Sequence, residues 1–287
     1  MQIKISNLTK KFGSKVALDN INLEITSGMF GLLGRNGAGK TTLMRIIATT
    51  LIKDQGSVTI CGVPVEKTKD IRDIIGYLPQ DFSMYPNMKV YEAMDYLGVL
   101  SNIPKQERKK IIPELLDKVN LYDYRNFRVK ALSGGMKRRL GIAQAIMHSP
   151  KVLIMDEPTA GLDPEERIRF RNLLSEIATD RIVILSTHIA GDIEATCENI
   201  AILNEGKIIY KGTTESLANT AENKVYNITI DNRELNKYKQ KYKIISMFIQ
   251  EGNTVLRVLS DSKPSEDAKE CKSTIEDGYM LMMGGQI

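Results

Sequence analysis

Residues 34–41 read Gly34-Arg35-Asn36-Gly37-Ala38-Gly39-Lys40-Thr41, and this stretch decides the fold. It fits the pattern G-x-x-x-x-G-K-[ST] at every fixed position. A short apolar segment, Phe30–Leu33, runs directly into it, and apolar residues at helical spacing follow over Thr41–Ala48. The sequence therefore predicts a strand, a glycine-rich loop and a helix in direct succession, which is the context that the pattern requires.

The chemistry of this loop indicates a polyphosphate ligand. Glycine allows the tight turn in which many backbone N–H groups point inward. The N-terminus of the following helix favours an anion by roughly 0.3–1 kcal/mol. Lys40 adds a full charge, which contributes about 4 kcal/mol at roughly 4 Å and an effective dielectric of about 20, before desolvation. Thr41 supplies a hydroxyl for Mg²⁺, so we expect Gly34–Thr42 to bind a nucleoside triphosphate, although kinases and GTPases share this loop.

Three further apolar segments each end in polar residues. Ile74–Leu78 precedes Gln80, Val152–Met155 precedes Asp156 and Glu157, and Ile182–Leu185 precedes His188. Buried strands separated by helical segments indicate a mainly parallel sheet with a crevice at its carboxyl edge. We therefore expect these polar side chains to meet at that edge.

Asp156 and Glu157 form the acidic pair of this set. An aspartate at a strand end can hold Mg²⁺ opposite Thr41, directly or through water. Glu157 is then placed to polarise a water for in-line attack on the terminal phosphate. An acidic pair at a strand end is just as often a turn or a helix cap. Here Lys40 and Thr41 require a magnesium partner, which favours the catalytic interpretation.

The stretch Leu132-Ser133-Gly134-Gly135 opens a helix that we predict over Ser133–Met147. Serine before two glycines is a good N-cap, and a cap alone explains the motif equally well. The exposed amides, the hydroxyl and the helix dipole also form a second anion site. Because the chain has one phosphate loop, this second site predicts contact with the nucleotide of another subunit.

The rest of the pattern predicts the architecture around these motifs. Apolar and polar residues alternate over Ile3–Ile5 and Ile21–Ile25, which indicates half-buried antiparallel strands. Residues from about 81 to 150 are predicted as a helical insert, with a kink or break at Pro113. We therefore predict an α/β fold: a P-loop NTPase core with a mainly parallel sheet, an antiparallel β subdomain and a helical insert, plus a small C-terminal α+β extension.

The polar stretch Thr213–Asn223 is interpreted as a linker, so residues 1–218 are predicted as one domain and 219–287 as an accessory domain. The accessory pattern predicts a turn at Glu251–Asn253, a second helix over 265–273 and a last strand over 279–283. The resulting order βαββαβ is that of a ferredoxin-like unit. An irregular tail packed on the main domain explains the pattern equally well.

The composition is that of an ordinary globular protein, with 42% hydrophobic and 26% charged residues in 287. Forty basic against 35 acidic residues give a net charge of +5 without a long basic run, which favours a solvated surface over a nucleic-acid interface. Cys61, Cys197 and Cys271 lie far apart and are typical of reduced thiols in a cytosolic protein. No apolar run approaches the roughly 18 residues of a membrane span, so a role at a membrane requires a membrane-bound partner.

Residues 1 to about 218 resemble the nucleotide-binding subunit of ATP-binding cassette (ABC) proteins. The resemblance rests on motifs in that family's order and approximate spacing: the phosphate loop, Gln80, Leu132–Gly135, Asp156-Glu157, Ala160-Gly161-Leu162-Asp163 and His188. The combination is highly specific, because other phosphate-loop families lack the Leu-Ser-Gly-Gly signature and the later histidine.

The resemblance implies roles that the residues alone leave open. Phe12 would stack on adenine, although a lone phenylalanine is otherwise assigned to the core. Gln80 would touch Mg²⁺ or the attacking water, although a lone glutamine is usually a surface residue. His188 would contact the terminal phosphate, and Asp163 would lie at a dimer interface. The family's signature commonly continues with Gln where this chain has Met136, and we expect activity to survive that departure.

The predicted site therefore has three parts. The catalytic residues are Glu157, His188, Gln80 and Lys40, and the magnesium ligands are Thr41, Gln80 and Asp156. The nucleotide-binding residues are Phe12, Gly34, Arg35, Asn36, Gly37, Ala38, Gly39, Lys40, Thr41, Thr42, Ser133, Gly134 and Gly135.

The resemblance further implies an ATPase subunit that dimerises around two ATP, with Mg²⁺, and drives separate transmembrane permease subunits. The second ATPase subunit would be another copy or a paralogue, with no nucleic acid as partner. The helical insert near Phe82–Leu100 would grip a cytoplasmic helix of the permease. The protein would then be cytoplasmic and peripheral on the inner face of the cell membrane.

The sequence as a whole is most similar to the ATPase subunits of bacterial ABC-2 exporters of the multidrug, lantibiotic or bacitracin-resistance type. A soluble ABC ATPase of translation, DNA repair or iron–sulfur assembly is the alternative. Translation members usually carry two cassettes and repair members carry long coiled coils, and neither is present here. The iron–sulfur assembly ATPase therefore stays open.

Overall fold

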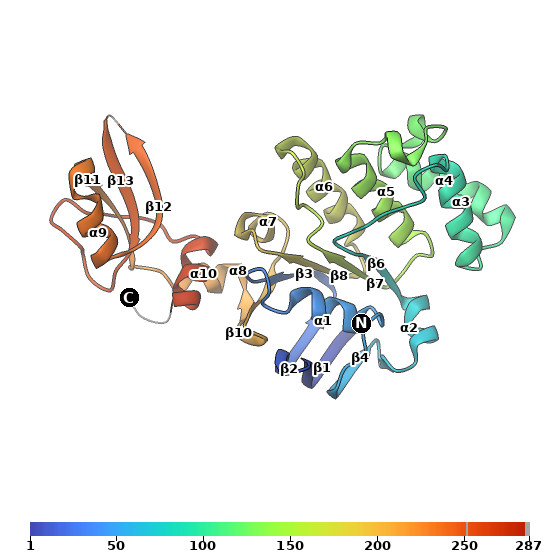
Figure 1. The fold of residues 1–287 in the computed structure, drawn as a ribbon, viewed down its shortest axis with the longest axis horizontal. Helices are drawn as coiled ribbons and strands as arrows, with labels where there is room; N and C mark the ends of the chain where they lie inside the picture. The colour runs from blue at the N-terminus through green and yellow to red at the C-terminus, as the bar shows by residue number, and fades with distance from the viewer. Residues whose placement is uncertain (251, 285–287) are drawn as a thin grey trace. The chain divides into compact units, whose positions relative to one another are not determined.

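The computed structural model of the chain describes residues 1–250 and 252–284. It divides into two compact units (Figure 1). The first consists of Met1–Cys197 and Leu203–Ile208, and the second of Glu198–Ile202 and the described part of 209–287. The division runs through a hairpin formed by β9 (Asn199–Asn204) and β10 (Lys207–Thr213).

The centre of the first unit is a parallel sheet. Its strands are β3 (Gly28–Leu33), β8 (Ile182–Thr187), β7 (Val152–Asp156) and β6 (Ile75–Leu78), and the full sheet has the order β10-β9-β3-β8-β7-β6. Neighbours β3 and β8, β8 and β7, and β7 and β6 all pair in parallel. Every residue of β7 and β8 is buried, as expected for strands that are covered on both faces. The predicted parallel sheet is confirmed.

A second, antiparallel sheet has the order β2-β1-β4-β5. Its strands are β1 (Gln2–Phe12), β2 (Lys15–Thr26), β4 (Gln55–Ile60) and β5 (Val63–Pro64). Ile3 pairs with Ile25 and Ile5 with Leu23, and all four side chains are buried, so the alternation predicted near the N-terminus is confirmed. The first helix, α1 (Lys40–Ile47), contacts both β2 and β7 and thereby joins the two sheets (Figure 1).

Helices form the remaining part of the first unit. They are α2 (Thr68–Ile74), α3 (Val90–Leu100), α4 (Lys105–Lys118), α5 (Gly134–Ile146), α6 (Pro164–Ile177) and α7 (Ala190–Glu194), with 3₁₀ turns at Tyr122–Tyr124 and Val129–Ala131. The break expected at Pro113 is wrong, because α4 runs through it. Ile112 and Leu116 are fully buried in the core on either side, and tertiary packing stabilises the helix despite the lost hydrogen bond.

The second unit contains a helix where we predicted a linker. α8 (Thr214–Asn219) starts at Thr213, whose hydroxyl accepts a hydrogen bond of 3.0 Å from the Ser216 amide. Leu217 is fully buried, which anchors the helix. The linker prediction for Thr213–Asn223 is therefore wrong, since a cap and one buried apolar residue suffice for a short helix in tertiary context. The expected domain boundary at residue 218 falls inside α8.

The remainder of this unit is an antiparallel sheet with two helices. Its elements are β11 (Val225–Ile230), a 3₁₀ turn (Asn232–Glu234), α9 (Leu235–Lys241), β12 (Lys243–Gln250), β13 (Asn253–Leu259), β14 (Lys269–Glu270) and α10 (Ile275–Gly284), and the strand order is β12-β13-β11-β14. The first strand, helix and hairpin agree with the predicted order. Glu251, in the predicted turn, lies outside the described residues, as do residues 285–287.

The last two elements differ from the prediction. The helix expected over 265–273 is wrong, because this segment contains the short strand β14, which pairs with β11. The strand expected over 279–283 is also wrong, because α10 covers it. Thr274 and Asp277 cap this helix reciprocally, and Gly278 lies directly against the Leu217 carbonyl of α8. The second unit is thus α+β without the ferredoxin-like order.

The chain therefore has the predicted α/β fold: a phosphate-loop core, an antiparallel β subdomain, a helical insert and an α+β extension. Over residues 1–250 and 252–284, no helix combines the length and the apolar character needed to cross a membrane.

Candidate functional site

The phosphate loop lies between β3 and α1, as predicted. Gly37 and Gly39 adopt φ angles of 83° and 111°, which side chains rarely tolerate. A Cβ at Gly34 would lie 2.3 Å from the Leu203 carbonyl oxygen, so this glycine is required for close packing beneath the loop. Lys40 Nζ donates to the Gly34 carbonyl at 2.8 Å and is almost fully buried. The buried Lys40 side chain therefore holds the start of the loop through a hydrogen bond to its backbone.

A cavity of about 380 Å³ opens over this loop. It is lined by Phe12, Lys15, Ala17, Asn36, Gly37, Gly39, Lys40, Thr41, Thr42, Gln80 and Glu157. Nine of these eleven residues were predicted as site residues, so residues from β1, the phosphate loop, the end of β6 and the end of β7 are brought to one place. Phe12 is 50% exposed at the cavity wall, which leaves its ring accessible to a flat ligand.

Glu157 lies at the centre of the charged groups. Its Oε1 is 3.1 Å from Lys40 Nζ, and its Oε2 is 3.1 Å from His188 Nδ1. The Glu157 amide donates to the Ser186 hydroxyl oxygen at 3.1 Å, and its φ angle is 47°, in the left-handed region. The end of β8 therefore fixes the direction of a carboxylate at the end of β7.

Asp156 is fully buried just before it. The Ser186 hydroxyl donates to Asp156 Oδ1 at 2.5 Å. Among the described residues, no side chain or backbone group donates a hydrogen bond to Asp156 Oδ2. An orphaned carboxylate oxygen at full burial is costly unless a cation or water satisfies it. Asp156, with the Thr41 hydroxyl and the Gln80 amide at the cavity wall, therefore fits an oxygen-ligated ion such as Mg²⁺.

The signature stretch begins α5, and none of its residues lines this cavity in the described structure. Ser133 is the N-cap, and its Oγ accepts a hydrogen bond of 3.2 Å from the Met136 amide. Ser133 and Gly134 are exposed, and open space surrounds Gly134. Gly135 is buried against Glu166 of α6. The exposed start of α5 is thus available to a ligand outside the chain's own cavity.

Some predicted residues lie near the cavity without lining it. Gly34, Arg35 and Ala38 shape the loop, since Lys40 Nζ donates to the Gly34 and Arg35 carbonyls and Ala38 accepts a bond from Gly206. Asp156 accepts a hydrogen bond from Ser186, and His188 contacts the carboxylate of Glu157, which lines the cavity.

Three contributors were missed by sequence reasoning. Lys15 and Ala17, on β2, line the cavity. Arg138 of α5 donates to the Pro79 carbonyl at 3.1 Å and to the Glu157 carbonyl at 3.4 Å. Burial lowers the pKa of the Arg138 guanidinium, opposed by nearby acidic groups. No local pattern in the sequence indicates these contacts.

This fold and site define a phosphate-loop nucleotide-binding protein. The sequence matches the ABC transporter family over residues 18–160. It is 35% identical over 229 residues to the uncharacterized ABC transporter ATP-binding protein YxlF of Bacillus subtilis, a span of 79% of this chain and 76% of that protein. It is also 35% identical over 218 residues to the Nod factor export ATP-binding protein I of Paraburkholderia xenovorans, covering 75% of this chain and 72% of that protein.

A solved structure shares the fold of the same region. The dimeric post-hydrolysis state of the ATP-binding cassette MJ0796, bound to ADP and Pi, matches with a TM-score of 0.66 and 27% identity, over 74% of this chain and 98% of that one. The chain belongs to the ABC transporter family, as one of its ATP-binding proteins. It binds ATP and is an ATPase.

Proposed function

We propose that this chain is the ATPase subunit of an exporter, and that two ATPase subunits close around two ATP to drive separate transmembrane permease subunits. The carboxylate of Glu157, held between Lys40 and His188 at the phosphate loop, is the observation that carries this proposal. In-line hydrolysis requires a general base, a cation that binds phosphate and a group that contacts the terminal phosphate. Glu157, Lys40 and His188 would fill these three roles in that order.

In this proposal the phosphate loop binds the nucleotide before any chemistry occurs. The amides of residues 34–42 and Lys40 hold the phosphates, and Phe12 stacks on the base. Thr41, Gln80 and Asp156 would hold Mg²⁺, which neutralises charge on the terminal phosphates when bound. Full burial of Asp156 strengthens its interaction with a cation.

Glu157 then acts on the attacking water. Its carboxylate accepts a proton as the water oxygen approaches the terminal phosphorus in line with the leaving oxygen. His188, which contacts Glu157 Oε2, contacts the terminal phosphate and stabilises its charge in the transition state. Lys40 remains with the phosphate oxygens, so each charged side chain has a separate task.

The second half of each site would come from the other ATPase subunit, a second copy or a paralogue. Ser133–Gly135 of one subunit would cap the nucleotide of the other, and Asp163 would lie at their interface. The exposure of Ser133 and the open space at Gly134 support this assignment, and MJ0796 was solved as a dimer. ATP would close the dimer and hydrolysis would reopen it.

The permease would dock on the helical insert. A groove lined by Phe82, Ser83, Met84, Pro86, Val129, Lys130, Lys137 and Leu140 supports this, since an apolar floor with basic edges suits an amphipathic cytoplasmic helix. The protein would then be peripheral on the inner face of the cell membrane. The word export in the name of the Nod factor relative supports the direction.

The C-terminal region would be an accessory part of this machine. We place the nucleotide chemistry in residues 1–218 and a binding or sensor role in 219–287. The separate core around Tyr226, Ile228, Leu256 and Val258 supports an independent module. Co-purification from native membranes tests the whole assembly, and recovery with soluble partners alone would argue against a permease.

The catalytic assignment is tested by Glu157→Gln. We expect this variant to bind ATP and to lose turnover by on the order of a hundredfold or more, because an amide cannot accept the proton. Glu165→Gln is a control, since Glu165 is exposed and pairs only with Arg169 among the described contacts. Wild-type hydrolysis by Glu157→Gln, measured as phosphate release, would remove Glu157 from the role of base.

A further inference from the structure

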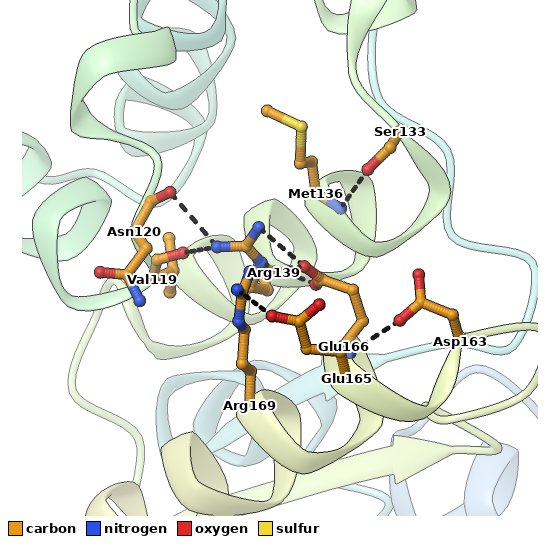
Figure 2. A network of polar contacts seen from close by, with 9 residues as sticks. All are labelled: Val119, Asn120, Ser133, Met136, Arg139, Asp163, Glu165, Glu166 and Arg169. Atoms are coloured by element: carbon orange, nitrogen blue, oxygen red, sulfur yellow. Dashed lines mark hydrogen bonds and ion pairs between the residues drawn. The ribbon is translucent and has the colours of Figure 1, made fainter.

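The first turns of α5 and α6 are joined through one carboxylate (Figure 2). Glu166 lies in the first turn of α6, where its amide donates to Asp163 Oδ1 at 2.8 Å. Its carboxylate extends toward α5, the helix that carries the signature stretch. A single residue thus touches the start of both helices.

The partner of Glu166 on α5 is Arg139. Arg139 Nε is 3.2 Å from Glu166 Oε2, and Nη2 is 3.5 Å from Oε1. The third nitrogen, Nη1, donates to the carbonyls of Val119 and Asn120 at 2.9 and 3.2 Å. Arg139 is 7% exposed, so water screens this pair little. The guanidinium therefore has partners on both sides, and Glu166 Oε1 also accepts a hydrogen bond of 3.2 Å from Arg169 Nη1 of α6 (Figure 2).

Gly135 of the signature lies directly on this carboxylate. A Cβ at Gly135 would be 2.7 Å from Glu166 Oε2 and 3.0 Å from Cδ and Cγ. Real Cβ atoms essentially never lie within 3.0 Å of another heavy atom, so an added Cβ would force the Glu166 side chain to shift away from Gly135. The backbone of Gly135 can approach Glu166 because it has no side chain. Gly135, the last residue of the signature, is therefore in close contact with the Glu166 side chain.

A second contact connects the same helix to the chain's own site. Arg138, adjacent to Arg139, donates to the carbonyl of Glu157. The segment from Glu157 to Glu166 is therefore held to α5 at both of its ends. The signature stretch and Glu157 are therefore connected through adjacent arginines of α5.

We propose that Glu166 and Arg139 are positioning residues: their ion pair holds Ser133–Gly135 in the geometry that caps the other subunit's nucleotide and couples it to Glu157 of the same chain. This rests on the proposed composite site. The Arg139–Glu166 pair, which lies outside the phosphate loop and the signature, would then set the geometry in which the nucleotide is capped. Loss of the pair lowers capping and turnover and leaves the chain's own nucleotide binding intact.

The experiment compares Glu166→Gln with Glu165→Gln in the full chain. The two glutamates are neighbours on α6, but the Glu165 side chain is 77% exposed and the Glu166 side chain 16%. Three quantities are measured for each: the Kd of MgATP for the isolated chain, ATP-dependent self-association in a Glu157→Gln background, and kcat against KM for hydrolysis.

For Glu166→Gln we expect weaker ATP-dependent association and a fall in kcat of about tenfold, less than the roughly hundredfold that a misplacement of about 1 Å can cost, because the neutral amide keeps the size of the carboxylate. The Kd of MgATP and KM stay within about twofold, and Glu165→Gln matches the wild type in all three measurements. Equal kcat and association for the two variants would overturn the proposal. An equal loss of MgATP binding and kcat in Glu166→Gln would also overturn it, since the role would then be general support of the fold.

A second pair of variants tests the Gly135 contact directly. Gly135→Ala should lower kcat through its collision with Glu166, so adding Glu166→Ala should cause little further loss. Additive losses would contradict the contact as the cause. Failure of the proposed function is distinguishable from both results, because it would appear as absent MgATP binding or as full turnover by Glu157→Gln.

Discussion

Asp156 in the first unit and Asp277 in the second are both fully buried carboxylates, but their surroundings differ. Asp277 is saturated: Arg257 Nε donates to Oδ1 at 2.9 Å, and Arg257 Nη2 and the Thr274 amide donate to Oδ2 at 2.6 and 2.7 Å. Asp156 receives one hydrogen bond, from Ser186, and its Oδ2 has no donor among the described residues.

The difference distinguishes a buried charge that holds the fold from one that serves a ligand. A saturated carboxylate in the interior contributes stability only while all its partners remain. An incompletely satisfied carboxylate costs stability and persists where a ligand completes it. The hydrogen bonds of Asp277 are those of a scaffold residue in the second unit, and the unpaired Oδ2 of Asp156 supports its proposed role at the site of the first.

The largest expected effect comes from Asp156→Asn. If Asp156 is a magnesium ligand as proposed, ATP hydrolysis should fall by on the order of a hundredfold or more, because the variant loses several kcal/mol of charge stabilisation. Circular dichroism should show an unchanged fold. The measurement is phosphate release across a Mg²⁺ titration, and a wild-type rate at any Mg²⁺ concentration would place the metal elsewhere.

Asp277→Asn should instead affect stability. It leaves the Arg257 charge without its partner, so we expect the local free energy of unfolding to fall by about 3 kcal/mol. Native-state hydrogen exchange of β11 and β13 amides measures this locally. Lys224→Met is the control, since its pair with Asp261 is exposed and should contribute less than about 1 kcal/mol. If Asp277→Asn lowered ATP turnover and left the free energy of unfolding unchanged, the structural role of Asp277 would be contradicted.

Gly278→Ala tests the packing beside Asp277. An added Cβ would lie 2.1 Å from the Leu217 carbonyl oxygen, so the variant should destabilise the second unit by about 1–3 kcal/mol. Gly191→Ala on α7 is the matched change, because nothing lies within 4 Å of its Cβ position, and we expect a change within about 0.5 kcal/mol. Similar exchange rates in both variants would show that the α8–α10 contact is loose.

The smallest effect is the dependence of the second unit on pH. Burial alone would raise the pKa of Asp277, but hydrogen bonds from Arg257 and Thr274 outweigh it and lower the pKa below its ordinary 3.8. The folded state therefore gains stability above that value and loses it as the pH falls through the lowered pKa. The stability difference between wild type and Asp277→Asn should shrink on acidification below about pH 4. A constant difference would mean that Asp277 stays ionised throughout.

The first unit could be predicted from sequence because its chemistry is local. The phosphate loop is one contiguous stretch between a buried strand and a helix, and the polar residues at strand ends meet because parallel strands share an edge. Lys40, Gln80 and Glu157 therefore reach the same cavity as expected. Arg138 and Glu166 could not be predicted, since their contacts depend on how separate helices pack.

The second unit was predicted less well for a related reason. Residues 279–283 are an apolar run too short for periodicity to distinguish strand from helix. Their helical state depends on the Thr274–Asp277 cap and on Gly278 fitting against α8. The polar 213–223 stretch likewise becomes helical only because Leu217 finds a buried place. Tertiary contacts decide such segments.

The hairpin β9–β10 has a mechanical consequence. Residues 198–202 belong to the second unit and 203–208 to the first, so two of the three points at which the chain passes between the units lie within this hairpin. At its turn, the Gly206 amide donates to the Ala38 carbonyl at 2.9 Å, and the Leu203 carbonyl lies against Gly34. The chain therefore enters the second unit from a hairpin that is itself in contact with the phosphate loop. We expect bound nucleotide, by stabilising the loop, to raise the force at which a tether pulled from the C-terminus unfolds the first unit in an optical trap.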